Sequence, residues 1–315
     1  MKVSTRFTEN CKEAVVAFSG GADSVALLHW LKYNTDIKLT AVHVNHQINT
    51  SSTDWELFCR DFCKDHDIRF FSAKANIDAS KNLEANARDA RYKILAEFPQ
   101  RWVFTAHHAD DQTETFFLKL LRGSGIQGLT GIREQQYMSS YNGMFLIRPL
   151  LCTTKSEIYV YLQDHGLEYV VDPSNSTIEQ DRNKFRNVII PEIQKYFPSF
   201  NKSLIRSINA IRDANICLEE LAQLDIDRTA DLIDGEFVFR IEDLKELFPH
   251  RIRNLILYIL KDEGLSVSCK ELEQFSVDIQ WVTWDNKLEL SCKLNGKVTK
   301  KLKQTGKKLW LQNTE

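Results

Sequence analysis

The chain has 315 residues, of which 43% are hydrophobic and 27% are charged, and its formal net charge is −2. This composition is typical of a soluble globular protein with room for two ordinary domains. The amino-terminal stretch lacks the apolar run of a signal peptide, and no stretch is apolar over a membrane-spanning length. Seven scattered cysteines, an odd number, indicate reduced thiols, so we expect a cytoplasmic protein without membrane association.

The first predicted strand runs directly into a glycine turn. Residues 14–18 are apolar and suit a buried parallel strand, and apolar residues recur at helical spacing from Val25 onward. The turn between them reads Ser-Gly-Gly-Ala-Asp-Ser (residues 19–24), and both glycines are free to take positive φ. The N–H groups at the start of the next helix would bind a phosphate oxygen. The alternative is an ordinary turn in which Ser19 or Asp23 caps the helix.

This turn differs from the two familiar phosphate-binding motifs. No Gly-Lys-Ser/Thr follows the glycines, as a Walker A loop requires, and the spacing is not GxGxxG. A phosphate loop without lysine must rely on N–H groups, hydroxyls and a metal ion. Asp23 is placed to help hold Mg²⁺, which binds proteins through few carboxylates and shares phosphate oxygens.

Strand and helix patterns alternate through the first half of the chain. Strands are predicted at residues 14–18, 39–44, 68–73 and 102–107, each followed by a polar turn and a helical pattern. This rhythm predicts an α/β fold: a Rossmann-like parallel sheet flanked by helices, with ligands at the carboxyl ends of the strands.

The later part of the chain predicts a different organisation. Residues 146–166 indicate a loop and then a helix that starts near Thr154, and a helical spacer follows Ile190. Residues 243–264 read as a helix, and strand-like segments come last. We therefore predict a first domain over residues 1–213 and a small mixed domain over residues 214–315.

A second polar segment lies at residues 107–114, His-His-Ala-Asp-Asp-Gln-Thr-Glu. It is not HExxH, so it does not predict catalytic zinc. Asp111 and Glu114 share one helix face at i, i+3, where two carboxylates together would bind an ammonium group. The alternative is a set of acidic residues that open an amphipathic helix, with Asp110 as the cap. The two interpretations are compatible.

The motifs together resemble one family. SGGADS after the first strand is similar to the PP-loop of the N-type ATP pyrophosphatases. The remaining motifs resemble, in order, those of the tRNA(Ile)-lysidine synthases: HVNH (43–46), EANARDARY (84–92), TAHHADDQTETFFLKLLRGSGIQGLTGI (105–132), IRPLL (147–151), and DPSN (172–175) followed by DRNKFRNVIIP (181–191).

The resemblance implies a reaction. Such enzymes use ATP and Mg²⁺ to adenylate C2 of the wobble cytidine in an isoleucine tRNA with a CAU anticodon. L-lysine then displaces AMP and leaves lysidine, so the expected activity is a ligase that releases AMP and pyrophosphate. A homodimer is compatible with the sequence, which does not define the oligomeric state.

The resemblance also implies site residues. ATP binding is expected at Ser19, Gly20, Gly21, Ala22, Asp23, Ser24, His43 and Asn45, with Asp23 as the metal ligand. Catalytic roles are expected for Asp23, Asp111, Arg88 and Arg148, and lysine binding for Asp111 and Glu114. Contacts to tRNA are expected from Arg91, Arg182, Asn183 and Arg186. For the last three residues the alternative is a solvated helix face.

The predicted second domain carries a further tRNA candidate. Residues 293–308 hold seven lysines and no acidic residue, among them Lys300, Lys301 and Lys303. A basic patch on a near-neutral protein fits attraction to phosphates, so we expect tRNA recognition here. A solvated face is the alternative.

Two departures from the family pattern stand out. Ile48-Asn49 stands where the family commonly has Leu-Arg, which puts in doubt any contact assigned to that arginine. Longer members carry a further C-terminal domain, so the chain is a short form or an incomplete one.

Two rival functions fit the sequence less well. Cluster-bearing tRNA thiolation enzymes typically need CxxC pairs, whereas the nearest cysteines here, Cys59 and Cys63, are spaced CxxxC. A module that only binds nucleotide would not need Asp23, Asp111 and Glu114 together.

Overall fold

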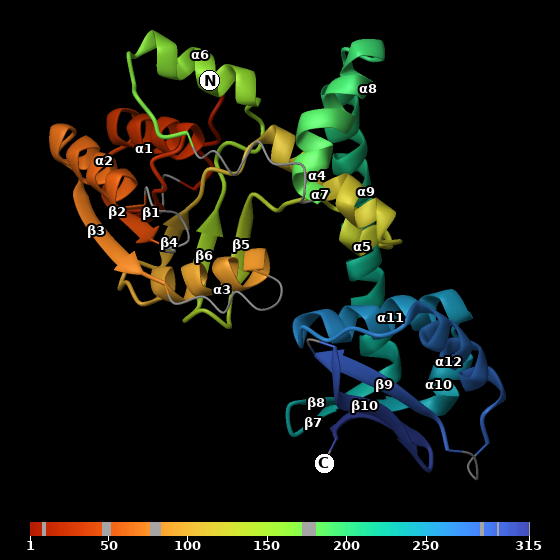
Figure 1. The fold of residues 1–315 in the computed structure, drawn as a ribbon. Coiled ribbons are helices and arrows are strands. Elements are labelled where there is room, and N and C mark those ends of the chain that lie inside the picture. Colours follow the sequence, from red (N-terminus) through yellow and green to blue (C-terminus); the bar gives the residue numbers. More distant parts are fainter. Residues whose placement is uncertain are drawn as a thin grey trace. The chain divides into compact units, whose positions relative to one another are not determined.

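The protein is described here as a computed structural model. The described residues are 1–7, 11–45, 52–75, 83–171, 181–283, 287–294 and 296–314. The chain forms two compact units, Met1–Arg212 and Asp213–Glu315. The first unit runs from red to green in Figure 1, and the second is mainly blue. Across the ranges given above, no helix combines the length and apolarity needed to cross a membrane.

The first unit is built on a six-stranded sheet with the order β3-β2-β1-β4-β6-β5. All neighbouring strands are parallel except β5, which runs antiparallel to β6. Val16 of the central strand is fully buried and pairs with Ala41 on one side and Phe104 on the other. The strands are β1 (Glu13–Ala17), β2 (Lys38–Asn45), β3 (Arg69–Lys74), β4 (Trp102–Phe104), β5 (Gln135–Met138) and β6 (Met144–Ile147).

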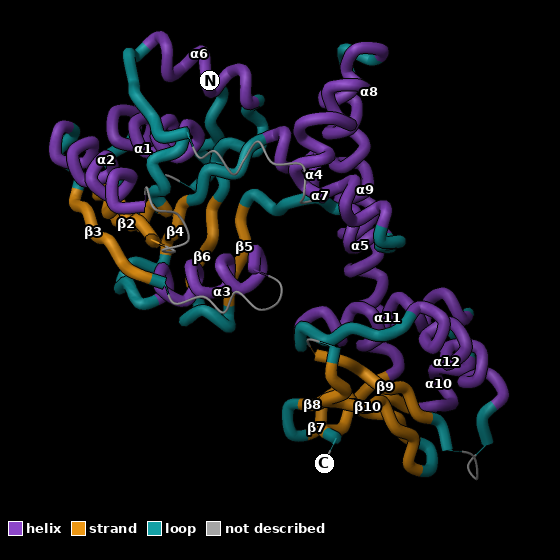
Figure 2. The backbone as a smooth tube through the Cα atoms, in the orientation of Figure 1, coloured by secondary structure: helices purple, strands orange, loops and turns teal. Residues whose placement is uncertain are grey.

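Helices cover both faces of this sheet, so the predicted α/β fold is confirmed. The helices α1 (Ala22–Asn34), α2 (Ser52–Asp65) and α6 (Lys155–Asp164) share one apolar core with the sheet, and α3 (Leu83–Ala96) contributes to the core of the other face. Figure 2 shows the sheet with α1 and α2 on one side and α3 on the other.

The remaining helical segments of this unit follow β4 and α6. They are α4 (Ala109–Leu121), α5 (Ile126–Leu129), α7 (Asp181–Lys184), a π-helical turn (Phe185–Ile189), α8 (Ile190–Tyr196) and the first part of α9 (Phe200–Thr229). The predicted helix near Thr154 is confirmed, because Thr154 is the N-cap of α6.

Residues 146 and 147 were predicted to lie in a loop, but they belong to β6. The four-residue run Met144–Ile147 is too short for its periodicity to distinguish a strand from a loop. Its hydrogen-bonded pairing with β4 and β5 decides the conformation.

The second unit has an antiparallel five-stranded sheet with the order β7-β8-β11-β10-β9. The end of α9 and the helices that follow it pack with this sheet around one apolar core. Its elements after α9 are β7 (Ala230–Ile233), β8 (Glu236–Arg240), α10 (Ile241–Lys245), α11 (Pro249–Asp262), α12 (Cys269–Trp281), β9 (Glu289–Leu294), β10 (Lys297–Thr305) and β11 (Lys308–Asn313).

The single helix predicted over residues 243–264 is wrong, because two helices occupy this stretch. Pro249 lacks a backbone N–H and therefore cannot continue α10, but it is well suited to the first position of α11.

Candidate active site

The turn between β1 and α1 presents the start of a helix to the carboxyl edge of the sheet. Gly21 is the N-cap and makes no side-chain cap, and Ser19 Oγ accepts the N–H of Gly21 at 3.3 Å. The alternative in which Ser19 or Asp23 caps α1 is therefore wrong. The N–H groups of the first turn have no carbonyl one turn earlier, so they are available for an anion.

The two glycines of the turn do different things. Gly20 has φ +81°, and a Cβ there would lie 2.9 Å from Cys59 Sγ. Gly21 is extended, with φ −71°, which corrects the expectation of positive φ at both. Gly20 therefore fixes the turn. At Gly21 the nearest atom to an added Cβ is Ser19 Oγ at 3.4 Å, an ordinary van der Waals distance, so the backbone there does not require glycine.

A cavity of about 300 Å³ opens beside this turn. Its polar lining includes Asp23, Arg91, His107 and Asp111. The full lining is Ala17, Phe18, Ser19, Gly21, Asp23, Ser24, Val42, Val44, Arg91, Thr105, Ala106, His107 and Asp111. Parallel strands and helix N-termini meet here, as the sheet topology predicts for a ligand site.

His43 and Asn45 are not among the residues that line this cavity, and their contact with ATP stays a prediction. Side chains alternate along a strand, so the cavity receives Val42 and Val44 while His43 and Asn45 point to the other face of β2. His43 Nδ1 lies 3.0 Å from the Phe18 carbonyl, and Asn45 Nδ2 donates to Glu56 at 3.4 Å. Burial lowers the pKa of His43.

Asp23 is paired with a residue that the sequence did not single out. Its Oδ1 lies 2.5 Å from Nζ of Lys155, the first residue of α6, and 3.8 Å from Nε2 of His108. Lys155 is 132 residues away from Asp23, so no local spacing could have indicated the contact.

The acidic pair on α4, Asp111 and Glu114, forms ion pairs with two arginines. Glu114 is fully buried and accepts hydrogen bonds from Arg182 Nε at 2.8 Å and Arg186 Nε at 2.6 Å. Asp111 Oδ1 accepts from both guanidinium groups, at 3.3 and 3.2 Å. A solvated helix face is therefore wrong for Arg182 and Arg186, while contact with tRNA stays a prediction.

The capping roles at the start of α4 also differ from the expectation. His108 is the N-cap of α4, and Asp111 Oδ2 accepts its backbone N–H at 2.9 Å. Asp110, expected to cap α4, instead accepts the backbone N–H of Lys155 at 2.8 Å. Asp111 thus combines a cap with an ion pair, and Asp110 joins the starts of α4 and α6.

The protonation states of the titratable side chains around the cavity follow from their burial and from neighbouring charges. Burial, together with nearby arginines, lowers the pKa of His107 to about 3, so this cavity-lining imidazole is neutral. Burial opposes ionisation of Asp111, but His108 and Arg182 outweigh it and lower its pKa to about 2. Burial disfavours the charged form of His108 too, yet Asp110, Asp111 and Asp23 raise its pKa.

Three further predicted residues occupy distinct environments. Arg88 is exposed, and its guanidinium carbon lies 5.1 Å from the centre of the Tyr92 ring. Arg148 is only 2% exposed and donates to the Arg133 carbonyl at 2.7 Å, and its catalytic role stays a prediction. Asn183 is buried rather than presented outward.

Several sequence features lie outside what the structure describes. They are Ile48, Asn49, the DPSN segment at residues 172–175 and the side chain of Glu84.

The lysine run belongs to the second unit, and Lys300, Lys301 and Lys303 lie on β10. Lys300 Nζ lies 2.8 Å from Glu263, and Lys301 Nζ lies 2.5 Å from Glu289. Lys303 Nζ lies 4.0 Å from the same Glu289. The positive charge expected here is therefore partly balanced by acidic side chains.

The donor set of the first unit fits a magnesium ion that is shared with phosphate. Among the described side chains there is no group of three or more His, Cys, Asp or Glu residues arranged to hold a metal. Asp23, with a hard oxygen donor beside a helix N-terminus, nevertheless matches the way Mg²⁺ binds through one or two carboxylates and substrate phosphates.

Comparison with known proteins identifies the fold and its class. Residues 2–193 match the family described as the PP-loop domain. Among solved structures, a U34-tRNA thiolase of Methanococcus maripaludis matches with a TM-score of 0.56 at 18% identity, over 67% of this chain and 75% of that one. The chain therefore belongs to the PP-loop family.

Curated relatives are more specific. The tRNA(Ile)-lysidine synthase of Nitrosomonas europaea is 38% identical over 78% of this chain and 54% of its own length. The enzyme of Haemophilus ducreyi is 37% identical over 82% of this chain and 60% of its own length. That of Coxiella burnetii is 31% identical over 89% of this chain and 62% of its own length. The chain thus spans somewhat more than half the length of these relatives.

Proposed function

We propose that this protein ligates L-lysine to C2 of the wobble cytidine in an isoleucine tRNA with a CAU anticodon, through an adenylated tRNA intermediate. ATP, with Mg²⁺, is converted to AMP and pyrophosphate. The observation that carries the proposal is the convergence, at one edge of the sheet, of an anion-binding helix start and a buried acidic pair.

In the first step, an oxygen at C2 of the cytidine attacks the α-phosphorus of ATP. A new P–O bond forms, the bond to the β-phosphate bridging oxygen breaks, and pyrophosphate leaves. The first-turn N–H groups of α1 fit the departing phosphates, because they are preorganised donors at the positive end of a helix. Bound Mg²⁺ would neutralise phosphate charge, and Asp23 would hold it.

In the second step, the lysine amine attacks C2, the C–O bond breaks, and AMP leaves with that oxygen. The attacking nitrogen loses a proton to solvent, because His107 in the cavity wall, with a pKa lowered to about 3, is too weak a base to take it. Asp111 lies in the same wall and is joined to Glu114 by the two arginines. These carboxylates suit the ammonium of the incoming lysine.

The arginines set a condition on lysine binding. Two carboxylates and two guanidinium groups are balanced in the present arrangement. A further cation gains net attraction only if Arg182 or Arg186 turns toward another anion, such as the lysine carboxylate or a tRNA phosphate. This explains how the same residues can serve both predicted partners.

The test is release of pyrophosphate with tRNA and lysine added separately. We expect release to require the tRNA, and stoichiometric formation of adenylated tRNA without lysine. Lysine should then convert this intermediate to lysidine and AMP. Full release with lysine alone, or none with the tRNA, would contradict the proposal.

A further inference from the structure

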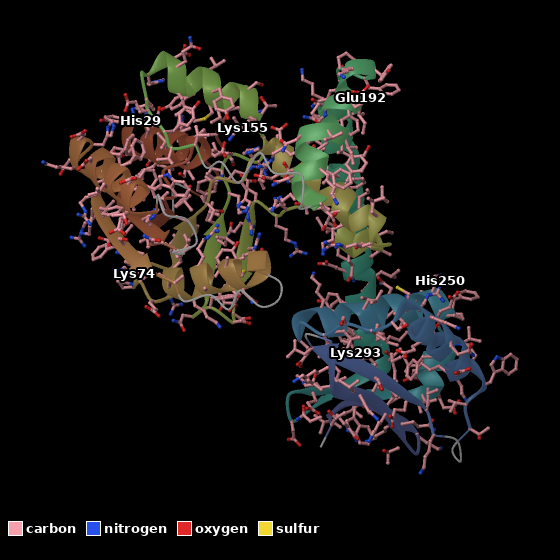
Figure 3. All side chains as sticks on the ribbon, in the orientation of Figure 1. His29, Lys74, Lys155, Glu192, His250 and Lys293 are labelled. Carbon is pink, nitrogen blue, oxygen red and sulfur yellow. The ribbon has the colours of Figure 1, made fainter. Side chains whose placement is uncertain are left out.

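The phosphate loop contains no lysine, yet a lysine from another helix reaches it. Nζ of Lys155, labelled in Figure 3, lies 2.5 Å from Oδ1 of Asp23. We infer that Lys155 is the phosphate-binding cation of this loop and that it contacts the pyrophosphate portion of ATP. The inference rests on the proposed function only in taking ATP as the substrate.

The main chain of Lys155 is fixed by the helices that form the site. Its N–H donates to Asp110 of α4 at 2.8 Å, and the carbonyl of the fully buried Thr153 accepts the N–H of Ala109 at 2.8 Å. Thr154 caps α6, and Glu157 Oε2 accepts its N–H at 2.7 Å. The start of α6 is therefore tied to the start of α4.

Three helix N-termini consequently meet at one edge of the sheet. The helices α1, α4 and α6 have 13, 13 and 10 residues, and hydrogen bonds or ion pairs between their first turns join them. Each contributes partial positive charge. The ammonium of Lys155 adds a full charge at this point, which a tri- or diphosphate would complement more completely than the single Asp23 carboxylate does.

The side chain of Lys155 is able to change partners. It is 34% exposed and Asp23 is 30% exposed, so neither charge needs the other to offset deep burial. Magnesium prefers carboxylate oxygens and would compete for Asp23. Lys155 would then be left beside phosphate oxygens, while the Tyr159 ring, whose centre lies 5.1 Å from Nζ, keeps a cation–π contact with its ammonium group.

The experiment measures binding of pyrophosphate and of AMP, each with Mg²⁺, by calorimetry on the full chain without tRNA or lysine. Loss of a charged hydrogen-bond partner predicts that Lys155→Met raises the Kd for pyrophosphate about ten- to hundredfold. AMP lacks the β- and γ-phosphates, so its affinity should stay unchanged. Lys155→Arg should keep most of the pyrophosphate affinity.

Lys38→Met is the matched control, because Lys38 makes a 3.1 Å ion pair with Glu13 at the opposite ends of their strands from the phosphate loop. It should change neither affinity. Unchanged pyrophosphate binding in Lys155→Met, or equal losses for pyrophosphate and AMP, would overturn the inference while the proposed function stands. Wild-type protein that binds neither AMP nor pyrophosphate would overturn both.

Discussion

Two ion clusters of the first unit have similar charges but very different surroundings. Asp23 and Lys155 form a pair in which each side chain is about one-third exposed. Asp111 and Glu114 face Arg182 and Arg186, and there the Glu114 side chain is fully buried and that of Asp111 is 10% exposed. An exposed pair can exchange partners at little cost, whereas a buried cluster must stay balanced whenever one member leaves. The first suits binding and release of phosphate, and the second suits exchange of one cation for another.

The largest effect on activity is expected for Asp23→Ala. Loss of the carboxylate that would hold Mg²⁺ should reduce pyrophosphate release at least about 10²- to 10³-fold, because charge developing on the phosphates is no longer offset. Stability should fall by no more than about 1 kcal/mol, since both side chains of the pair with Lys155 are about one-third exposed and screened by water. Pyrophosphate release and urea unfolding measured on one preparation test both statements. Near wild-type release would show that Asp23 has no part in catalysis.

A substitution in the buried cluster should lower the stability of the fold much more than Asp23→Ala does. Glu114→Ala leaves the guanidinium groups of Arg182 and Arg186 without their main acceptor, so the free energy of unfolding should drop by about 3–5 kcal/mol. Replacing both arginines by methionine in the same chain should recover part of this loss. If urea unfolding shows a loss as small as that of Asp23→Ala, with no recovery in the triple variant, the contrast between the two clusters fails.

Asp111→Asn separates lysine binding from folding. The asparagine side chain can still accept the N–H of His108, so the start of α4 is kept. Loss of the negative charge should raise the KM for lysine about ten- to hundredfold, equivalent to roughly 1.5–3 kcal/mol. Formation of adenylated tRNA without lysine should persist. An unchanged KM in the folded variant would restrict Asp111 to its capping role.

The sequence predicted the fold well where two independent signals agreed. The buried strand at residues 14–18 and the helix after Val25 were confirmed because apolar periodicity and glycine chemistry agree there. The strand β6 was missed, since four apolar residues take their conformation from neighbours that are distant in the chain. The break between α10 and α11 was missed although Pro249 marks it.

The candidate site could be predicted less completely than the fold. Asp23 and Asp111 were found from motifs, and both line the cavity. The two-residue alternation of β2 directs Val42 and Val44 to the cavity, whereas ATP contacts of His43 and Asn45 stay a prediction. The pairings of Lys155 with Asp23 and of Arg186 with Glu114 depend on tertiary packing across 132 and 72 residues, so no local pattern contains them.

The smallest effect is expected in the second unit, where the lysines of β10 resemble the exposed pair more than the buried cluster. If Lys300, Lys301 and Lys303 contact tRNA, changing all three to alanine should weaken binding and flatten its dependence on salt. Each lost phosphate contact on a duplex stem lowers the slope of log K against log salt by about 0.9. The total decrease in this slope should be smaller than three lost contacts would give, because Glu263 and Glu289 already pair with these lysines in the free protein.

Two matched variants make this prediction sharper. Lys261→Ala removes another lysine of the second unit, one that is paired with Glu219 at 2.6 Å and lies outside the run, and it should leave the slope unchanged. Glu289→Gln releases Lys301 and Lys303 from their carboxylate and should strengthen tRNA binding at low salt. Filter binding over a salt series measures all three variants. A slope that stays constant in the triple variant, with no gain from Glu289→Gln, would make the lysine run a solvated face and leave tRNA recognition to other residues.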